Sequence, residues 1–310
     1  MDQHNLPMSV SPDPRKGLPP VTPPSGRFIA QLFLVPGTIV LLAVLLLLAF
    51  RYLLGGAYTP DSFLRQLDSD NADIRWRGAS DLAQHIKRPE SKMLKADVNF
   101  ALDLAERLRN ALDELDQDEA ALAAKIAKLP PADQDKAWRK LAPQRDFVEY
   151  LASALGDFYA PVGVPLLCEI INRENAVDVK GNTMRRRRGI WALSNLGAHV
   201  QVLGTELSSA QQAKIMDGLQ QAMDGADPQR RVWALNAVYY LDKTAVAKDT
   251  AGLVLVDHAL AQCAKSQDRF LRLHVAMAFN FWDGDIAEPT LLTLAQDDGF
   301  GTLIRIEDKD

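Results

Sequence analysis

The chain has 310 residues, of which 47% are hydrophobic, and a formal net charge of −5 at pH 7. Binding of duplex nucleic acid depends on Lys and Arg side chains that neutralise phosphates, so this acidic balance argues against a nucleic-acid partner. The two cysteines, Cys168 and Cys263, are too few for a disulfide framework, and each lies in an apolar helical pattern that predicts a small buried side chain.

Residues 1–27 are rich in proline and poor in large apolar side chains. Such a segment cannot bury enough apolar surface to order itself, so we predict a Pro-rich disordered tail. The pairs Pro19-Pro20 and Pro23-Pro24 are compatible with docking on an aromatic groove, but a spacer is the favoured interpretation.

Residues 28–54 form a long apolar stretch, with no charged side chain between Phe28 and Phe50. A helix of this length, rising ~1.5 Å per residue, spans the ~30 Å hydrocarbon core of a bilayer. The main alternative is a cleaved signal peptide, whose apolar region usually has about 7–15 residues. Only Gly55-Gly56-Ala57 resembles a cleavage site here. We therefore predict a transmembrane helix that stays as a single-pass anchor in the lipid bilayer.

The side of the membrane on which the rest of the chain lies is only weakly indicated. Arg15, Lys16 and Arg27 precede the apolar stretch, whereas Arg51 and Arg65 follow it closely. The positive-inside rule counts Lys and Arg near both ends of the span, so this balance gives a slight preference for an exported C-terminal domain at the cell membrane.

The remainder of the chain has the pattern of an all-α protein, because no convincing strand alternation occurs in residues 59–296. Helix starts are predicted where a side-chain oxygen or a proline suits the first turn: Thr59-Pro60, Ser208-Ser209 and Asp227-Pro228. Helix ends are predicted at glycines that can adopt a left-handed cap: Gly156, Gly197 and Gly284.

An arginine followed four residues later by an alanine recurs along the chain. Residues 188–196 and 230–238 align without a gap, 42 residues apart, and the pattern returns after another 42 residues at 272–279. The pairs are Arg75 and Ala79, Arg188 and Ala192, Arg230 and Ala234, and Arg272 and Ala276. Trp191 and Trp233 precede two of these alanines and are predicted to pack in the core between repeats.

A second motif supports the same period. Gly156-Asp157 and Gly284-Asp285 are 128 residues apart, close to three periods. Two unrelated motifs with one period indicate a helical repeat protein, in which each hairpin buries its apolar face against its neighbours. The alanine lets the next helix approach, and we expect the arginine to pair with acidic residues near helix starts, such as Asp73, Asp227 and Asp268.

The period is broken after the first repeat, because Arg75 and Arg188 are 113 residues apart. The intervening residues 92–142 predict a long amphipathic helix with apolar positions from Phe100 to Ile126, a Pro130-Pro131 break and a short helix with Trp138. A long helix that packs along the array is favoured, and a protruding hairpin that meets a partner is the alternative. The predicted division is a first repeat at 55–91, the insertion at 92–142, and a repeat array with a C-terminal cap at 143–310.

These motifs resemble the HEAT-like repeats of bacterial proteins. Leu155-Gly156-Asp157 with Pro165-Leu166-Leu167 matches the turn and second helix of that repeat, and the arginine–alanine stretches match its first helix. The resemblance implies a right-handed α-solenoid of about five HEAT-like hairpins behind one N-terminal transmembrane helix. It also implies a concave face lined by the second helices, at about 161–172, 208–223, 250–264 and 286–296. The whole chain is similar to small bacterial membrane proteins that place such an array behind one helix.

The longest basic run is Arg185, Arg186 and Arg187 followed by Arg188. A solvated helix start is the favoured interpretation, and contact with anionic headgroups or an acidic partner is the alternative. The five histidines and two cysteines lack metal-ligand spacing, and no phosphate-binding glycine loop or nucleophile elbow occurs. We therefore predict no catalytic, cofactor-binding or metal-binding residues and no enzymatic activity.

The expected function is that of a membrane-anchored HEAT-repeat scaffold, which mediates interaction with an unidentified protein partner at the membrane surface. An accessory subunit of a membrane transport or secretion complex is the alternative. In that case the anchor helix would itself pack on other membrane helices.

Overall fold

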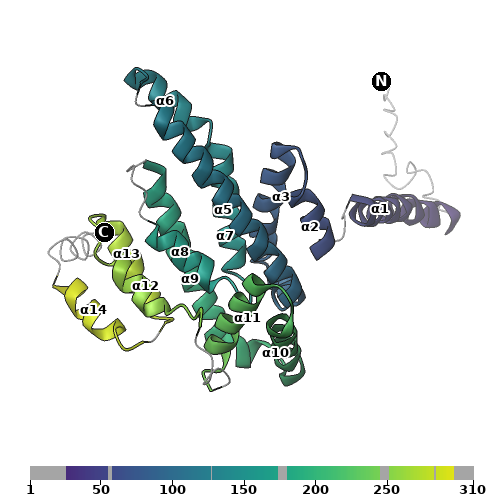
Figure 1. Cartoon of the computed structure of the whole chain (residues 1–310). Helices are drawn as coiled ribbons and strands as arrows, with labels where there is room; N and C mark the ends of the chain where they lie inside the picture. The colour runs from purple at the N-terminus through teal and green to yellow at the C-terminus, as the bar shows by residue number, and fades with distance from the viewer. Residues whose placement is uncertain are drawn as a thin grey trace, which may run out of the picture. The chain divides into compact units, whose positions relative to one another are not determined.

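The computed structural model describes residues 26–54, 58–126, 128–173, 180–244, 251–282 and 284–296. Within these ranges the chain forms fourteen α-helices and one 3-10 turn and contains no strand, which confirms the predicted all-α class (Figure 1). The chain divides into two compact units, Met1–Ala57 and Tyr58–Asp310. The predicted tail up to residue 25 and the predicted cap after residue 296 lie outside the described residues.

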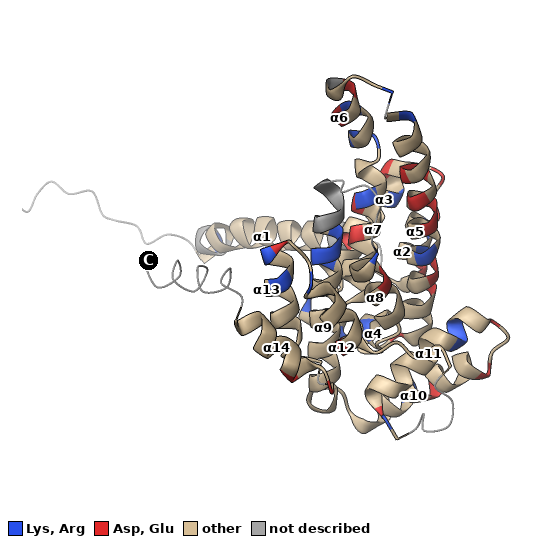
Figure 2. Ribbon diagram, turned by 60° about the vertical axis from the view of Figure 1, so that its left-hand side comes forward, with Lys and Arg blue, Asp and Glu red and all other residues tan. Residues whose placement is uncertain are grey.

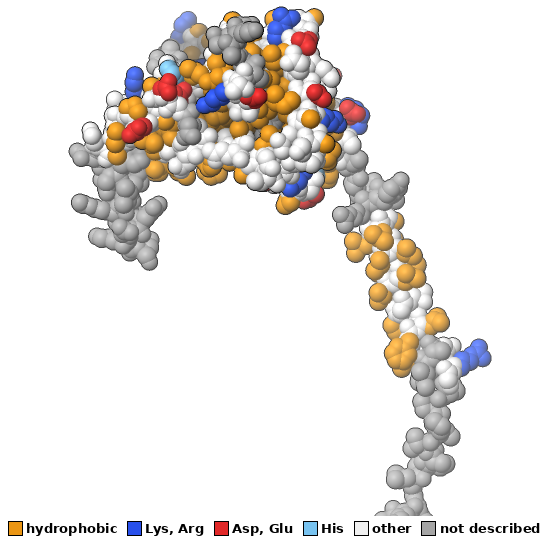
Figure 3. Space-filling model, turned by 90° about the horizontal axis from the view of Figure 1, so that it is seen from below, with side chains coloured by type: hydrophobic (Ala, Val, Ile, Leu, Met, Phe, Trp, Pro, Cys, Tyr) orange, Lys and Arg blue, Asp and Glu red, His pale blue; other side chains and the backbone are white. Residues whose placement is uncertain are grey.

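The first unit contains α1 (Gly26–Leu54), in which Pro36 is accommodated without a break. Its segment Gln31–Ala49 has a mean hydropathy of 2.8, and none of it is buried. Figure 3 shows apolar side chains on the described part of this helix. α1 is therefore long and apolar enough to cross a membrane, and the same length and composition also suit a signal sequence.

The second unit contains the other helices. In chain order they are α2 (Pro60–Leu67), α3 (Ala72–His85), η1 (Pro89–Ser91), α4 (Lys92–Lys95), α5 (Val98–Ile126), α6 (Pro131–Arg139), α7 (Ala142–Leu155), α8 (Val164–Asn172), α9 (Lys180–Glu206), α10 (Ser209–Asp224), α11 (Pro228–Leu241), α12 (Val256–Cys263), α13 (Arg269–Ala278) and α14 (Ala287–Ala295).

The predicted helix starts are confirmed by their capping hydrogen bonds. Thr59 and Ser208 each form a capping box, in which the cap side chain accepts from the backbone N–H three residues later. Asp227 accepts from the backbone N–H groups of Gln229 and Arg230. Each cap satisfies N–H groups that have no partner inside the helix, and so fixes where the helix begins.

The predicted helix end at Gly156 is confirmed, because α7 ends at Leu155, but Gly156 is in a right-handed conformation. The ends predicted at the other two glycines are wrong: Gly197 lies inside α9, and the helix before Gly284 ends at Ala278. Among the described residues only Gly252 has a positive φ, so the predicted left-handed caps are wrong as well.

A side chain has no room at Gly156 and Gly197: a Cβ on Gly156 would lie 2.6 Å from the Ala192 carbonyl oxygen, and one on Gly197 would lie 2.7 Å from Phe281 Cβ. Glycine is needed at both positions for the close approach of neighbouring elements, which local sequence does not reveal.

The predicted long amphipathic helix is confirmed as α5. Its buried side chains recur at helical spacing from Val98 to Leu115, and this face contacts α7, α8, α10 and α11. The break at Pro130 and the short helix with Trp138 are also confirmed, because α6 begins at Pro131. The first half of α5 therefore belongs to the core of the second unit.

The helices of the second unit pack in two rows. α3, α7, α9 and α13 contact one another in that order, and α5, α8 and α12 form a second row beside them. Contacts of α5 with α7, α8 with α9, and α12 with α13 join the rows, and one continuous hydrophobic core fills the space between them. The hairpin of α10 and α11 packs on α5 and α8.

This packing does not follow the 42-residue order of the arginine–alanine pattern. Hairpins stacked in chain order would place α11 between α9 and α13, but α13 packs directly on α9. α8 also differs from the implied concave surface, because most of its side chains, including Leu166, Leu167 and Ile171, are buried. α8 is a central helix of the core.

Candidate functional site

The alanines of the repeat pattern lie at helix contacts. Ala79, Ala192 and Ala234 are fully buried, and Ala276 is half-buried against the core. Small side chains at these positions allow close helix packing, as the sequence predicted.

The two tryptophans beside these alanines differ. Trp233 is only 2% exposed, as predicted, because residues 233–238 of α11 are all buried. The core prediction for Trp191 is wrong, because its side chain is 49% exposed. α9 packs through Ile190, Leu193 and Leu196, and Trp191 shares the opposite, exposed side of the helix with Arg188.

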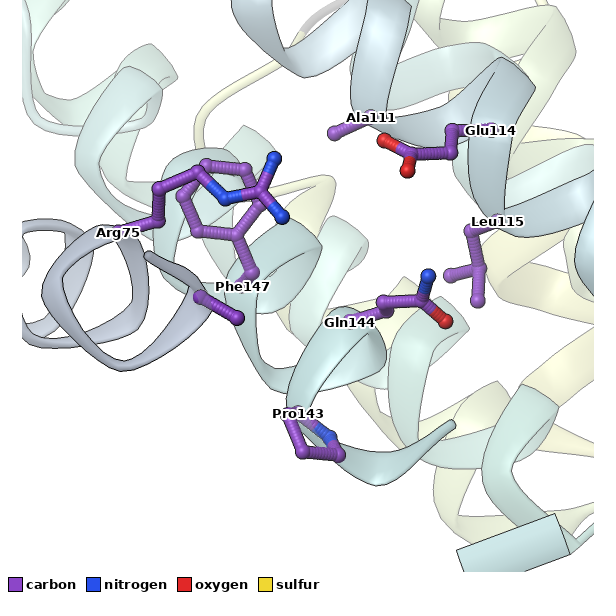
Figure 4. A pocket seen from close by; sticks show the side chains of 8 residues that line it. Arg75, Ala111, Glu114, Leu115, Pro143, Gln144 and Phe147 are labelled. Carbon is purple, nitrogen blue, oxygen red and sulfur yellow. The ribbon is translucent and has the colours of Figure 1, made fainter. Parts of the chain in front are cut away.

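The four arginines of the repeat pattern lie in four different environments. Arg75 lies over the Phe147 ring, with 5.9 Å from the guanidinium carbon to the ring centroid. Together they line a cavity of about 40 Å³ between α3, α5 and α7, which Glu114 also lines (Figure 4). A space of this size holds water and no larger ligand, so Arg75 serves packing.

Arg188 is exposed and lies 3.4 Å from Glu149 of α7. Arg230 lies 2.6 Å from Asp103 and 2.7 Å from Glu106, both on α5. Arg272 donates to the backbone carbonyl oxygens of Ser266 and Gln267. Arg230 shows the predicted pairing with the acidic residue at its own helix start, because it lies 3.7 Å from Asp227.

The basic run of α9 is used inside the fold. Arg185 is 3% exposed and forms an ion pair of 2.7 Å with the buried Glu119 of α5, so the predicted solvated helix start is wrong at this position. Arg186 donates to the Ile171 carbonyl oxygen, and Arg187 forms an ion pair with Asp268. The acidic partners of this run lie on other helices, so the run offers little charge to a bilayer or to an acidic protein.

Arg185 belongs to a network of ion pairs that fastens the second half of α5 to α7, α8 and α9. The basic members are Arg109, Arg145, Arg173 and Arg185, and the acidic members are Asp113, Asp116, Glu119 and Glu169. Burial raises the pKa of Asp116, although Arg173 and Arg185 act in the opposite direction. The charges balance, which suits a role in holding helices together.

A second polar cluster surrounds the Gly-Asp motif at the end of α7. Asp157 is 5% exposed, and its Oδ1 lies 3.6 Å from Nε2 of His199 on α9, whereas its Oδ2 is buried and has no hydrogen-bond partner among the described residues. Lys95 is also buried, with its Nζ 5.9 Å from the centre of the Tyr159 ring. The Tyr159 hydroxyl donates to Glu206 at the end of α9. Asp285 of the second Gly-Asp motif is exposed, so the two motifs have different environments.

This cluster shifts several pKa values. Burial lowers the pKa of Lys95, although Asp157 and Glu206 act in the opposite direction. Burial and the hydrogen bond to Glu206 raise the pKa of Tyr159, and the same hydrogen bond lowers the pKa of Glu206. The cluster ties α4, the end of α7 and the end of α9 together in a mostly buried setting.

An open groove of about 610 Å³ lies on the other side of α4. Tyr58, Thr59 and Pro60 form its rim at the start of α2, residues 93–99 form one wall, and α10 forms the opposite wall. Tyr58 stacks on His85, with ring centroids 4.2 Å apart.

Gly218 permits the close crossing of α10 over α5, because a Cβ there would lie 3.2 Å from Val98 Cβ. Apolar Met93, Leu94 and Val98 line one wall of the groove, and polar side chains of α10 such as Lys214 and Asp217 line the other. The groove was not predicted from the sequence, because it depends on how α10 crosses α5, more than a hundred residues away in the chain.

Comparison with known proteins gives no family: no family model matches this chain, and no curated protein matches it. The HEAT-like resemblance therefore stays a prediction. Among the described residues, no group of three or more His, Cys, Asp and Glu side chains is arranged to hold a metal ion.

Proposed function

We propose that this protein is a membrane-anchored scaffold of HEAT-like helical hairpins, which binds a protein partner in the groove between α2, α5 and α10. One combination of features carries the proposal. The apolar segment of α1 has no buried residue, and five residues separate the end of α1 from α2, the first helix of a unit with an open groove. A tether of this kind holds a binding surface close to the bilayer.

The HEAT-like part of the proposal is supported by the two rows of paired helices and by the buried repeat alanines. Rows of this kind are expected where helical hairpins stack side by side. The hairpin of α10 and α11 departs from this arrangement, since it packs on α5 and α8 and does not extend the rows. We propose that this departure creates the groove, because it places α10 on α5 beside the start of α2.

The chemistry of the groove suits a protein partner. Its rim exposes Met93 and Tyr58, which are 65% and 55% exposed. Methionine is a flexible, polarizable contact residue, and tyrosine is enriched at binding hot spots. Lys214 and Asp217 on the opposite wall offer charges of both signs, which can fix the orientation of a bound segment.

Site-specific photo-crosslinking in intact membranes tests this proposal. A photoreactive residue in place of Met93 should capture one protein, whereas the same residue in place of Gln220, which is exposed on α10 but outside the groove, should not. The double charge reversal Lys214→Glu and Asp217→Lys should abolish capture while helicity and melting temperature stay unchanged. Equal capture from both positions, or loss of capture only together with earlier melting, would rule out the groove.

The second candidate function is an accessory subunit whose anchor packs on other membrane helices. Gly37 and Thr38 of α1 favour it, because small residues let membrane helices approach closely. Replacement of residues 28–54 by an unrelated apolar helix distinguishes the two functions. A tethered scaffold keeps its partner after the exchange, whereas an accessory subunit loses it. We further propose that the protein has no enzymatic activity and that its second unit lies on the exported side of the cell membrane.

A further inference from the structure

The tip of the hairpin formed by α5 and α6 has properties that the core packing does not use. After Leu115, the buried residues of α5 are only Glu119 and Ile126, and no described side chain of α6 is buried. Figure 1 shows α6 beside the far end of α5, away from the other helices of the second unit. We call residues 125–140 the basic tip.

The basic tip concentrates positive charge in an acidic chain. It contains five basic residues and two acidic ones, a net charge of +3, whereas the whole chain carries −5. The basic residues are Lys125, Lys128, Lys136, Arg139 and Lys140. All five are exposed, and in the described part of the chain none of them forms an ion pair. In the ribbon of Figure 2, several acidic residues lie along α5, and basic residues lie at and near α6.

The turn of the hairpin adds an apolar contact at a fixed position. Leu129 is 39% exposed, and Pro130 and Pro131 beside it are also exposed. The Gln134 side chain donates to the Leu129 carbonyl oxygen over 2.8 Å and holds the turn. Behind the turn, Arg145 covers the Trp138 ring and forms an ion pair with Glu119, which fastens the tip to the body of the unit.

We propose that the basic tip docks on the anionic lipid headgroups of the bilayer that holds α1. Lysines around an apolar turn suit this surface, because their long side chains reach phosphate groups while leucine and proline contact the acyl boundary. A lipid surface is favoured over an acidic protein because the exposed basic residues surround the exposed apolar turn at Leu129, and because the proposed anchor confines the chain to a bilayer. The inference rests on the membrane anchor of the proposed function.

The test uses full-length protein reconstituted in vesicles of phosphatidylcholine, with or without phosphatidylglycerol. Leu129→Cys carries an environment-sensitive dye, and the two native cysteines are buried, so labelling is confined to the tip. The expected result is a blue-shifted emission with phosphatidylglycerol only, which added salt reverses. Lys128→Glu, Lys136→Glu and Lys140→Glu together should reduce this response at least about tenfold.

The matched control reverses three exposed lysines elsewhere, with Lys87→Glu, Lys243→Glu and Lys265→Glu, and should keep the response. An unchanged emission in both lipids overturns the proposal, as does an equal shift in both. A photoreactive residue at position 129 in intact membranes supplies the remaining outcome. If it captures a protein in the wild type but not in the triple lysine variant, and the dye shows no response to lipid, the tip binds an acidic protein and the lipid proposal is overturned. Alkaline extraction of the same vesicles separates the two hypotheses: release of the protein refutes the anchor, whereas retention with a silent dye refutes only the lipid contact.

Discussion

At the scale of single residues, the fold depends on close contacts that only the assembled structure defines. Two of the interior glycines of α9, Gly197 and Gly204, have opposite surroundings. A Cβ on Gly197 would lie 2.7 Å from Phe281 and 2.8 Å from the Trp282 ring, whereas a Cβ on Gly204 would meet nothing within 4 Å. One glycine is needed for packing, and the other only weakens the helix.

Gly197→Ala should lower the free energy of unfolding by about 1–3 kcal/mol, because the added methyl group overpacks the contact with Phe281. Gly204→Ala should raise it by up to about 1 kcal/mol, because alanine has the higher helix propensity. Urea unfolding in detergent, followed by tryptophan fluorescence, measures both. Equal effects of the two substitutions would contradict the packing of this contact.

Arg185 and Arg188 of α9 differ in burial, so their contributions to stability should differ. Arg185→Ala should reduce stability by about 3 kcal/mol, at the lower end for a broken buried pair because Arg145 still neutralises Glu119. Arg188→Ala should change stability by no more than about 0.5 kcal/mol, since its side chain is exposed. The same unfolding experiment compares them, and a larger loss from Arg188→Ala than from Arg185→Ala would refute the arrangement.

The hydrogen bond between Tyr159 and Glu206 should make stability depend on pH. It lowers the pKa of Glu206 below the ordinary 4.5, so its stabilisation is complete above that value and is lost as the pH falls through the lowered pKa. Tyr159→Phe should cost about 1 kcal/mol at neutral pH, a value discounted for the exposed carboxylate. This difference from the wild type should vanish in acid.

Tyr240→Phe is the matched control, because the Tyr240 hydroxyl donates to the backbone carbonyl of Val254, which does not titrate. Its cost should be the same at neutral and at acidic pH. A cost of Tyr159→Phe that also stays constant would show that the hydroxyl does not bind an ionised Glu206.

At the scale of helices, local sequence signals predicted where helices begin, but they did not predict how the helices cross one another. Thr59, Ser208 and Asp227 mark helix starts because a capping hydrogen bond is made within four residues. The exposure of Trp191 depends on which side of α9 faces its neighbours, and the groove depends on α10 crossing α5. These contacts join residues that are far apart in the chain, so no local pattern in the sequence predicts them.

The central place of α8 can be tested by a pair of leucines. Leu167→Ala on α8 should cost about 2–5 kcal/mol, because Leu167 is fully buried and the truncation leaves a cavity. Leu292→Ala on α14 should cost no more than about 0.5 kcal/mol, since Leu292 is 57% exposed. Thermal melting of both variants decides whether α8 is a core helix or part of an open concave face, for which the two costs would be similar.

At the scale of the whole molecule, the all-α class followed from the sequence, because apolar periodicity and the absence of strand alternation are properties of every segment. The order in which the helices pack against one another did not follow from the sequence. The equal spacing of the arginine–alanine pattern predicts hairpins in chain order, yet α13 packs on α9 and the hairpin of α10 and α11 lies on α5 and α8. The spacing of a motif in the sequence indicates that helical hairpins recur, but it does not determine which hairpin packs against which.

The central claim is that α1 remains part of the mature protein and holds it in the membrane. Alkaline extraction of membranes, followed by intact mass measurement, tests this claim most directly. The account predicts that the protein stays in the extracted membrane with the mass of the full chain, 34.2 kDa. A soluble protein whose mass lacks α1 would identify a cleaved signal sequence and would contradict the tethered scaffold.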